Sequence, residues 1–151
     1  MKKLFALLGV SLLLASLLLA CASTEPTQAP EVAEPVTAAL RISGPATELN
    51  LSEADLKAMP QVSVEYTDKD GNTTTYTGVL ITELLKSSGQ TGTPDLALVA
   101  GDGYTYDLAA ADYQNCTDCI VAFDPEGGLR SVLPALDSKA QVKDLVEIQI
   151  K

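Results

Sequence analysis

Two of the three cysteines stand close together in the segment "NCTDCI", where Cys116 and Cys119 have the spacing C-x-x-C. This spacing suits a dithiol redox site, half of a metal site or a structural disulfide. A dithiol redox site places the pair at a helix N-terminus, where the helix dipole lowers the thiol pKa. Here the following residues, "IVAF", predict a strand, and the charge of Asp118 inside the motif disfavours a thiolate. The redox interpretation is therefore the less favoured one.

A zinc site is the second possibility for this pair. Zinc needs four ligands, and the chain has no histidine, so that only a dimer could complete a site on these two cysteines. Outside the cytoplasm, two cysteines this close are most simply joined to each other. We therefore expect a disulfide between Cys116 and Cys119, with the redox and metal interpretations as alternatives.

The absence of histidine limits the chemistry further. It removes the commonest general base, and no Ser-His-Asp or Cys-His catalytic arrangement can be built inside this chain.

The N-terminal residues indicate where the protein is found. Lys2 and Lys3 precede an apolar run at 4–19, which is typical of a secretory signal over residues 1–20. The tetrapeptide "LLAC" ends at Cys21 and resembles the bacterial lipobox, whose cysteine is diacylated. Two acyl chains hold a protein stably on a bilayer. We expect attachment to a membrane of the bacterial cell envelope through lipid on Cys21, facing outside the cytoplasm; the alternative is an ordinary cleaved signal.

Residues 21–38, rich in Pro, Glu and Thr, predict an extended tether, and residues 39–151 then form one folded domain. Loss of the signal leaves 8 basic residues against 20 acidic ones, a net charge of −12. Such a surface repels nucleic acid, which we therefore exclude as a partner.

The patterns within the domain predict an α+β fold, a mixed β-sheet with a few short helices. Ser52 and Asp55 predict a capping box for a helix that Pro60 ends, and "GVLITELLKSSG" predicts a second helix ending at Gly89. Alternating or β-branched runs predict strands at 39–43, 61–67, 73–78, 95–100, 104–108, 120–123 and 145–150.

The turn at 68–72 begins like a calcium-binding EF-hand loop. Gly71, however, is at the fourth position instead of the sixth, and Val79 at the twelfth position has no carboxylate. We expect a hairpin turn with Gly71 in the left-handed region.

Several segments occur in an order that is similar to a known family: "LSEADLKAMP", "YTGVLITELLKSSG", "LVAGDGYTYDL", "IVAFDPEGGLRSVLPA" and "VKDLVEIQI". The succession covers residues 40–151 and resembles the oxidoreductase molybdopterin-binding domain of the sulfite oxidase type. The resemblance implies a cofactor cleft bordered by Asp102, Gly103 and Tyr104, with Arg130 and Lys143 contributed by later elements.

Each of these residues also has a structural interpretation. Residues 101–103 suit a tight turn into a strand, and Tyr104 and Tyr106 alternate as aromatic residues of a sheet do. Arg130, among apolar neighbours, suits a salt bridge. We expect a solvated acidic face from the carboxylates that have no ligand-like spacing: Asp102, Asp107, Asp112, Asp118 and Asp124.

The sequence departs from the family where molybdenum is held. The family's thiolate ligand belongs in the region 61–78, which has no cysteine here, and Cys116 and Cys119 do not match that position. Arg41 and Arg130 are the only arginines, although the family surrounds the cofactor's phosphate with arginines and often a histidine. We expect no cofactor and no metal, and a stand-alone, degenerate member of this fold.

The sequence thus predicts a lipid-anchored, extracytoplasmic, non-catalytic module that binds a small molecule or serves as an accessory to an envelope protein. An active molybdopterin-dependent oxidoreductase, completed by a partner if necessary, is one alternative. An acidic protein-interaction domain is the other.

Overall fold

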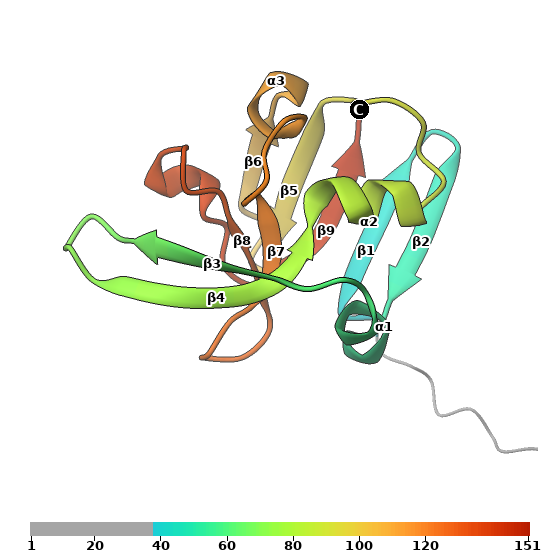
Figure 1. The fold of residues 1–151 in the computed structure, drawn as a ribbon. Coiled ribbons are helices and arrows are strands. Elements are labelled where there is room, and N and C mark those ends of the chain that lie inside the picture. Colours follow the sequence, from blue (N-terminus) through green and yellow to red (C-terminus); the bar gives the residue numbers. More distant parts are fainter. Residues whose placement is uncertain (1–37) are drawn as a thin grey trace, which may run out of the picture. The chain divides into compact units, whose positions relative to one another are not determined.

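The computed structural model describes residues 38–151 (Figure 1). The signal, the tether and the lipid predicted on Cys21 fall outside the described residues, apart from residue 38. Strands make up most of this part of the chain: β1 (Leu40–Gly44), β2 (Thr47–Leu51), β3 (Val62–Thr67), β4 (Thr73–Leu80), β5 (Leu96–Ala100), β6 (Thr105–Leu108), β7 (Ile120–Phe123), β8 (Leu129–Val132) and β9 (Leu145–Ile150). The helices are short: α1 (Glu53–Ala58), α2 (Ile81–Ser87), α3 (Ala110–Tyr113) and the 3-10 turn η1 (Ser138–Ala140).

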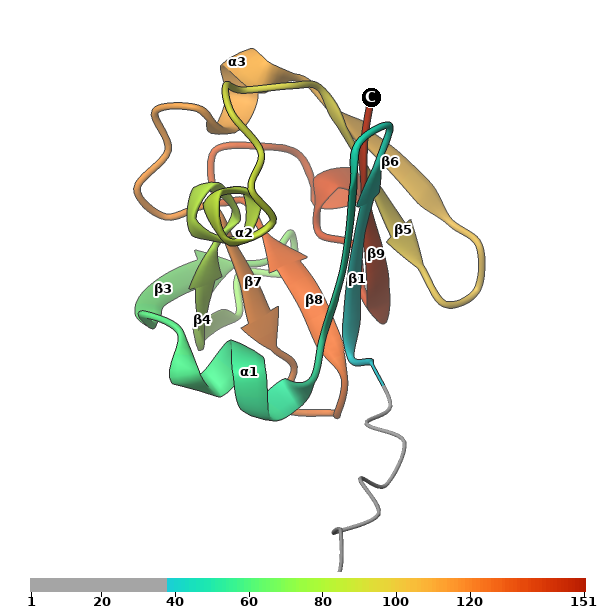
Figure 2. The same ribbon diagram turned by 90° about the vertical axis from the view of Figure 1, so that its right-hand side faces the viewer.

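The strands form two sheets, which Figure 2 shows on opposite sides of the domain. One sheet has the order β2-β1-β9-β5-β6 and is mixed, because β1 and β9 are parallel while its other neighbours are antiparallel. The other has the order β3-β4-β7-β8 and is antiparallel throughout. Short helices beside these sheets confirm the predicted α+β class.

Two apolar clusters hold the sheets together. The larger cluster takes Ile42 and Leu98 from the mixed sheet, Val121 from β7 and Leu84 from α2. The smaller one packs Val64 and Tyr76 of the β3–β4 hairpin against the opposite face of β7 and β8. Because β7 and β8 are covered on both faces, almost all their side chains are buried.

Two local predictions are confirmed. Ser52 caps α1 by accepting from the Asp55 N–H, and the Asp55 carboxylate accepts from the Ser52 N–H in return. The turn between β3 and β4 has Gly71 at φ 85°, and Asp68 accepts hydrogen bonds from the backbone of Asp70 and Asn72. Asp68 is therefore part of a hairpin turn, as expected.

The start of α2 corrects the predicted helix. Residues 78–80 belong to β4, where Gly78 pairs with Ala122 and Leu80 with Ile120, so that the helix begins only at Ile81. Pairing with β7 provides hydrogen bonds for the backbone N–H and carbonyl groups of these residues, so they form a strand despite their helical pattern. The sequence prediction also missed β2, β8 and α3.

No helix in the described part of the chain is both long enough and apolar enough to cross a membrane.

Candidate functional site

The candidate site forms where β8 meets the segment that leads into β9. Arg130 of β8 pairs with Lys143 in an isolated antiparallel bridge. Ser131 connects β8 to the same segment by two hydrogen bonds. Its N–H donates to the Val142 carbonyl at 2.9 Å, and its hydroxyl accepts from the Val142 N–H at 2.8 Å. This backbone pairing places two cationic side chains next to each other.

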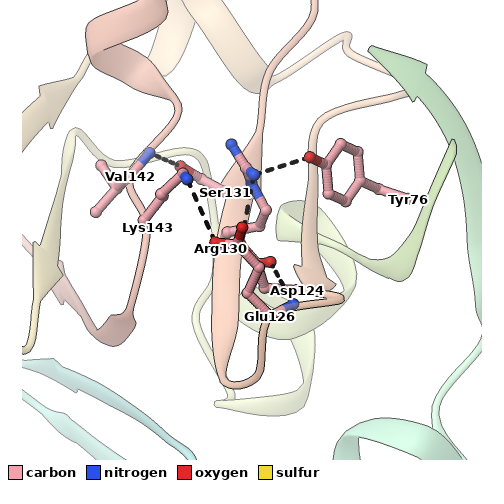
Figure 3. Close-up of polar contacts among 7 residues, drawn as sticks. All are labelled: Tyr76, Asp124, Glu126, Arg130, Ser131, Val142 and Lys143. Atoms are coloured by element: carbon pink, nitrogen blue, oxygen red, sulfur yellow. Dashed lines mark hydrogen bonds and ion pairs between the residues drawn. The ribbon is translucent and has the colours of Figure 1, made fainter. Parts of the chain in front are cut away.

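Arg130 is buried, with a relative exposure of 6%. Its Nη1 donates to the Tyr76 hydroxyl at 2.8 Å and lies 3.4 Å from Asp124 Oδ2 (Figure 3). Its Cζ lies 4.6 Å from the centre of the Tyr76 ring, within cation–π distance. Both polar contacts use Nη1, and the buried Nε has no hydrogen-bond partner among residues 38–151. The guanidinium is thus anchored at one nitrogen only.

The turn between β7 and β8 supplies the nearest carboxylates. The predicted salt bridge of Arg130 is present, with Asp124 as its partner. The side chain of Asp124 is only 8% exposed, so its assignment to a solvated acidic face is wrong. Asp124 is buried because the β7–β8 turn places its carboxylate against the Arg130 guanidinium. Glu126, by contrast, is exposed and lies 3.7 Å from Lys143 Nζ.

Three pockets adjoin this junction, and Lys143 lines all of them; we call them the Lys143 pockets. The largest, about 340 Å³, lies between the β3–β4 hairpin and η1. A second, about 250 Å³, shares Thr74, Tyr76 and Arg130 with the first. The third, about 260 Å³, includes Tyr104. A separate pocket of about 420 Å³ beside α2 contains none of the predicted site residues.

The structure brings four of the five residues implied by the family resemblance to the Lys143 pockets: Asp102, Tyr104, Arg130 and Lys143. Gly103 does not line them. It has φ 89°, and its N–H donates to the Ala100 carbonyl, as the turn interpretation predicts. Asp102 accepts from the Tyr104 N–H within this turn. Tyr104 is 43% exposed, and its hydroxyl donates to the Lys139 carbonyl.

Several lining residues were not predicted. Tyr66, Thr74 and Tyr76 come from the β3–β4 hairpin, and Ser138 and Gln141 come from the segment around η1. The alternation of side chains along β4 places Thr74 and Tyr76 on one face, but it does not predict which residues pack against that face. Gln141 is structural, because its amide donates to the Leu133 carbonyl and accepts from the Leu133 N–H.

The C-x-x-C pair forms a disulfide between Cys116 and Cys119, whose Cα atoms are 5.5 Å apart. It lies between α3 and β7, and neither cysteine lines the Lys143 pockets. Together with Asp118, these sulfurs are close enough to suggest a metal site. Sulfurs bonded to each other, however, are not thiolate ligands.

These residues do not fit a molybdenum–pterin cofactor. In the oxidised protein, residues 38–151 have no thiolate to bind molybdenum, since their two cysteines are joined. Lys69, Lys139, Arg130 and Lys143 line the pockets, but so do five carboxylates: Asp68, Asp70, Asp102, Asp124 and Glu126. This set gives no net positive field for a dianionic phosphate.

Comparison with known proteins supports the fold. No family model matches the chain, and no curated protein matches it either. Among solved structures, it is similar to the sulfane dehydrogenase SoxCD from Paracoccus pantotrophus, with a TM-score of 0.61 and 17% sequence identity. The match covers 74% of this chain but only 37% of that one. The chain therefore shares its fold, at low sequence identity, with part of that protein.

Proposed function

We propose that this protein is a non-catalytic module that binds a small molecule in the Lys143 pockets, on a fold related to a molybdopterin oxidoreductase. It is held at the bacterial cell envelope by lipid on Cys21 and faces outside the cytoplasm. The lipobox-like tetrapeptide and the preceding apolar run support the anchor.

The observation that carries this proposal is the state of Arg130. The side chain of Arg130 lines two of the Lys143 pockets and makes its hydrogen bonds to the described residues through Nη1 only. Its other terminal nitrogen, Nη2, therefore keeps N–H donors that a ligand in these pockets would satisfy.

The other side chains of the pockets are suited to binding. The rings of Tyr66, Tyr76 and Tyr104 offer flat surfaces, while Thr74 and Ser138 offer hydroxyls. Half of the eight basic residues outside the signal line these pockets, although the chain as a whole is acidic. Five carboxylates line the same pockets, so their charge is close to neutral and an anionic group is repelled less there than by the rest of the acidic chain.

Metal and pterin analysis of the protein from its own organism tests the non-catalytic role. We expect no stoichiometric molybdenum, and no pterin fluorescence after denaturation. One molybdenum per chain, or oxidation of sulfite or reduction of a sulfoxide that Arg130→Ala abolishes, would contradict the proposal and favour an active oxidoreductase.

A further inference from the structure

We infer that Cys116, Asp118 and Cys119 form a binding site for a divalent metal ion of the zinc type when the disulfide between the two cysteines is reduced. None of these residues lines the Lys143 pockets. The inference therefore goes beyond the proposed function and concerns a second, separate site.

The first step concerns the ligands. The two sulfurs and a carboxylate oxygen of Asp118 all lie within 4.8 Å of one another. Thiolate sulfur and carboxylate oxygen are both zinc ligands, and a water molecule fills the fourth position when the protein supplies three. Two sulfurs on one tetrahedral zinc are about 3.8 Å apart, because each Zn–S bond is about 2.3 Å long. Rotation of the two cysteine side chains supplies this separation once the S–S bond is broken.

The second step concerns the backbone, which holds the two cysteines near each other without the disulfide. The pair lies in the segment that joins α3 to β7 (Figure 1). The Cys116 N–H donates to the Tyr113 carbonyl at 3.1 Å, and the Cys119 carbonyl accepts from the Ile81 N–H at 3.0 Å. Both ends of the C-x-x-C loop are thus attached to neighbouring elements, so the Cα atoms, 5.5 Å apart, stay close after reduction. Cys119 is 3% exposed and Cys116 is only partly buried, so the site opens to solvent on the side of Cys116.

The third step concerns charge. Asp118 Oδ1 lies 3.0 Å from Cys116 Sγ. A negative charge beside a thiol disfavours the thiolate, so this carboxylate counts against a free redox dithiol. A divalent cation bound to all three groups removes that repulsion, and a thiol that coordinates a metal is deprotonated. Asp118 takes part in none of the ion pairs of residues 38–151, so no lysine or arginine of this part of the chain competes with the metal.

The disulfide controls whether the site can form. Reduction by a dithiol breaks the bond between the two sulfurs, which receive two electrons and two protons, while the dithiol becomes a disulfide. Metal binding then releases the two thiol protons to the solvent, and each sulfur donates an electron pair to the metal. Oxidation of the pair by another disulfide reverses these steps and releases the ion. The site is therefore closed in the oxidised protein and open in the reduced one.

Titration of the full-length protein in detergent with Cd²⁺ tests this. Cadmium takes the place of zinc and gives an ultraviolet charge-transfer absorption when thiolates bind it. The protein is compared as purified and after reduction with a phosphine, which is removed without oxygen before the titration. Cys116→Ser/Cys119→Ser, treated in the same way, keeps Cys21 and measures any contribution from that residue. Asp118→Asn removes the carboxylate ligand, and Asp112→Asn is its matched control, because the Asp112 side chain lies outside this group of ligands.

We expect the reduced protein to gain the charge-transfer absorption up to one cadmium per chain, with no change of oligomeric state, and an excess of Zn²⁺ to remove it. The oxidised protein and Cys116→Ser/Cys119→Ser should gain none. Asp118→Asn should weaken cadmium binding by at least about tenfold, as measured by competition with a chelator. Asp112→Asn should bind as the wild type does.

Other outcomes overturn the inference. Absence of the absorption in the reduced protein would do so, and so would an equal absorption in the oxidised protein or in Cys116→Ser/Cys119→Ser. One cadmium per two chains, with formation of a dimer, would indicate a site of four cysteines from two copies. Equal affinities of Asp118→Asn and Asp112→Asn would remove Asp118 from the ligands. Loss of the far-ultraviolet circular dichroism on reduction would show that the backbone does not hold the pair. None of these outcomes affects the proposed binding in the Lys143 pockets.

Discussion

Arg130 and Lys143 lie opposite each other in an antiparallel bridge, so that two cationic side chains are neighbours. Like charges directly opposite destabilise a sheet. Two carboxylates of the β7–β8 turn offset these positive charges: Asp124 contacts Arg130, and Glu126 contacts Lys143. The two ion pairs differ in environment: both side chains of the first are 8% exposed, whereas those of the second are 64% and 82% exposed.

This difference predicts unequal effects of neutralising the two carboxylates. Asp124→Asn leaves a buried guanidinium without its charge partner and should lower the free energy of unfolding by about 3 kcal/mol. Glu126→Gln breaks an exposed pair and should change it by less than about 1 kcal/mol. Urea denaturation measures both. Equal losses in the two variants would show that the pair of Arg130 and Asp124 is not a buried interaction.

Gly78 is predicted to be intolerant of a side chain. A Cβ at this position would overlap the Val121 carbonyl oxygen and lie 2.5 Å from Ala122 Cα, because β4 and β7 approach closely there. Backbone atoms cannot rotate away, so Gly78→Ala should destabilise the protein by about 3 kcal/mol. Thr77→Ala, at the exposed neighbouring position, is the control and should change stability by only about 0.5 kcal/mol. Thermal and urea unfolding check both; a Gly78→Ala protein as stable as the control would refute the close approach.

The disulfide predicts that the purified protein contains no free thiol at Cys116 and Cys119 before reduction. Thiol counting with and without a reductant checks this. Because the closed loop is so short, reduction should lower the free energy of unfolding by about 2 kcal/mol or less. Cys116→Ser/Cys119→Ser should match the reduced protein. Two thiols that react at once in the untreated protein would reopen the redox and metal interpretations.

Tyr113 predicts a loss of stability at alkaline pH. Its side chain is fully buried, and its hydroxyl donates to the Pro94 carbonyl. Burial, assisted by the charge of Asp95, raises the pKa of Tyr113 from 10.0 to about 12. The unfolded chain therefore releases this proton at a lower pH than the folded protein does. The stabilisation is complete below pH 10.0 and disappears as the pH rises to about 12.

The measurement is the free energy of unfolding as a function of pH, compared between the wild type and Tyr113→Phe. The variant lacks the titrating hydroxyl and should lose less stability over this range. An equally steep decline in both proteins would assign the alkaline transition to other groups.

We predict that the protein is attached to the membrane through lipid on Cys21. Cys21→Ala removes the acceptor of the acyl chains, so the protein should leave the membrane fraction or remain unprocessed. Fractionation and labelling with a radioactive fatty acid check this. Cys21→Ser is a second variant that keeps the size of the side chain and should behave in the same way. Membrane retention and acyl labelling equal to those of the wild type would disprove the lipid anchor.

The sequence by itself determined the features that depend on neighbouring residues. The capping box of Ser52 and Asp55, the Gly71 turn and the alternating strands are encoded over a few positions, because each is satisfied by local hydrogen bonds or by a period of two. The C-x-x-C spacing, with no histidine in the chain, likewise indicated the disulfide.

Tertiary structure decided how these elements pair and which faces they cover. Residues 78–80 have a helical pattern but form part of strand β4, because pairing with β7 gives their buried backbone its hydrogen bonds. Alternation placed Thr74 and Tyr76 on one face of β4, but only the packing of the hairpin on β8 brought Tyr76 to Arg130, 54 residues away. The burial of Asp124 arose in the same way, since a solvated and a paired carboxylate look identical in sequence. The residue types of the candidate site could thus be recognised in part from the sequence, whereas the contact between Arg130 and Tyr76 depends on the packing of the β3–β4 hairpin.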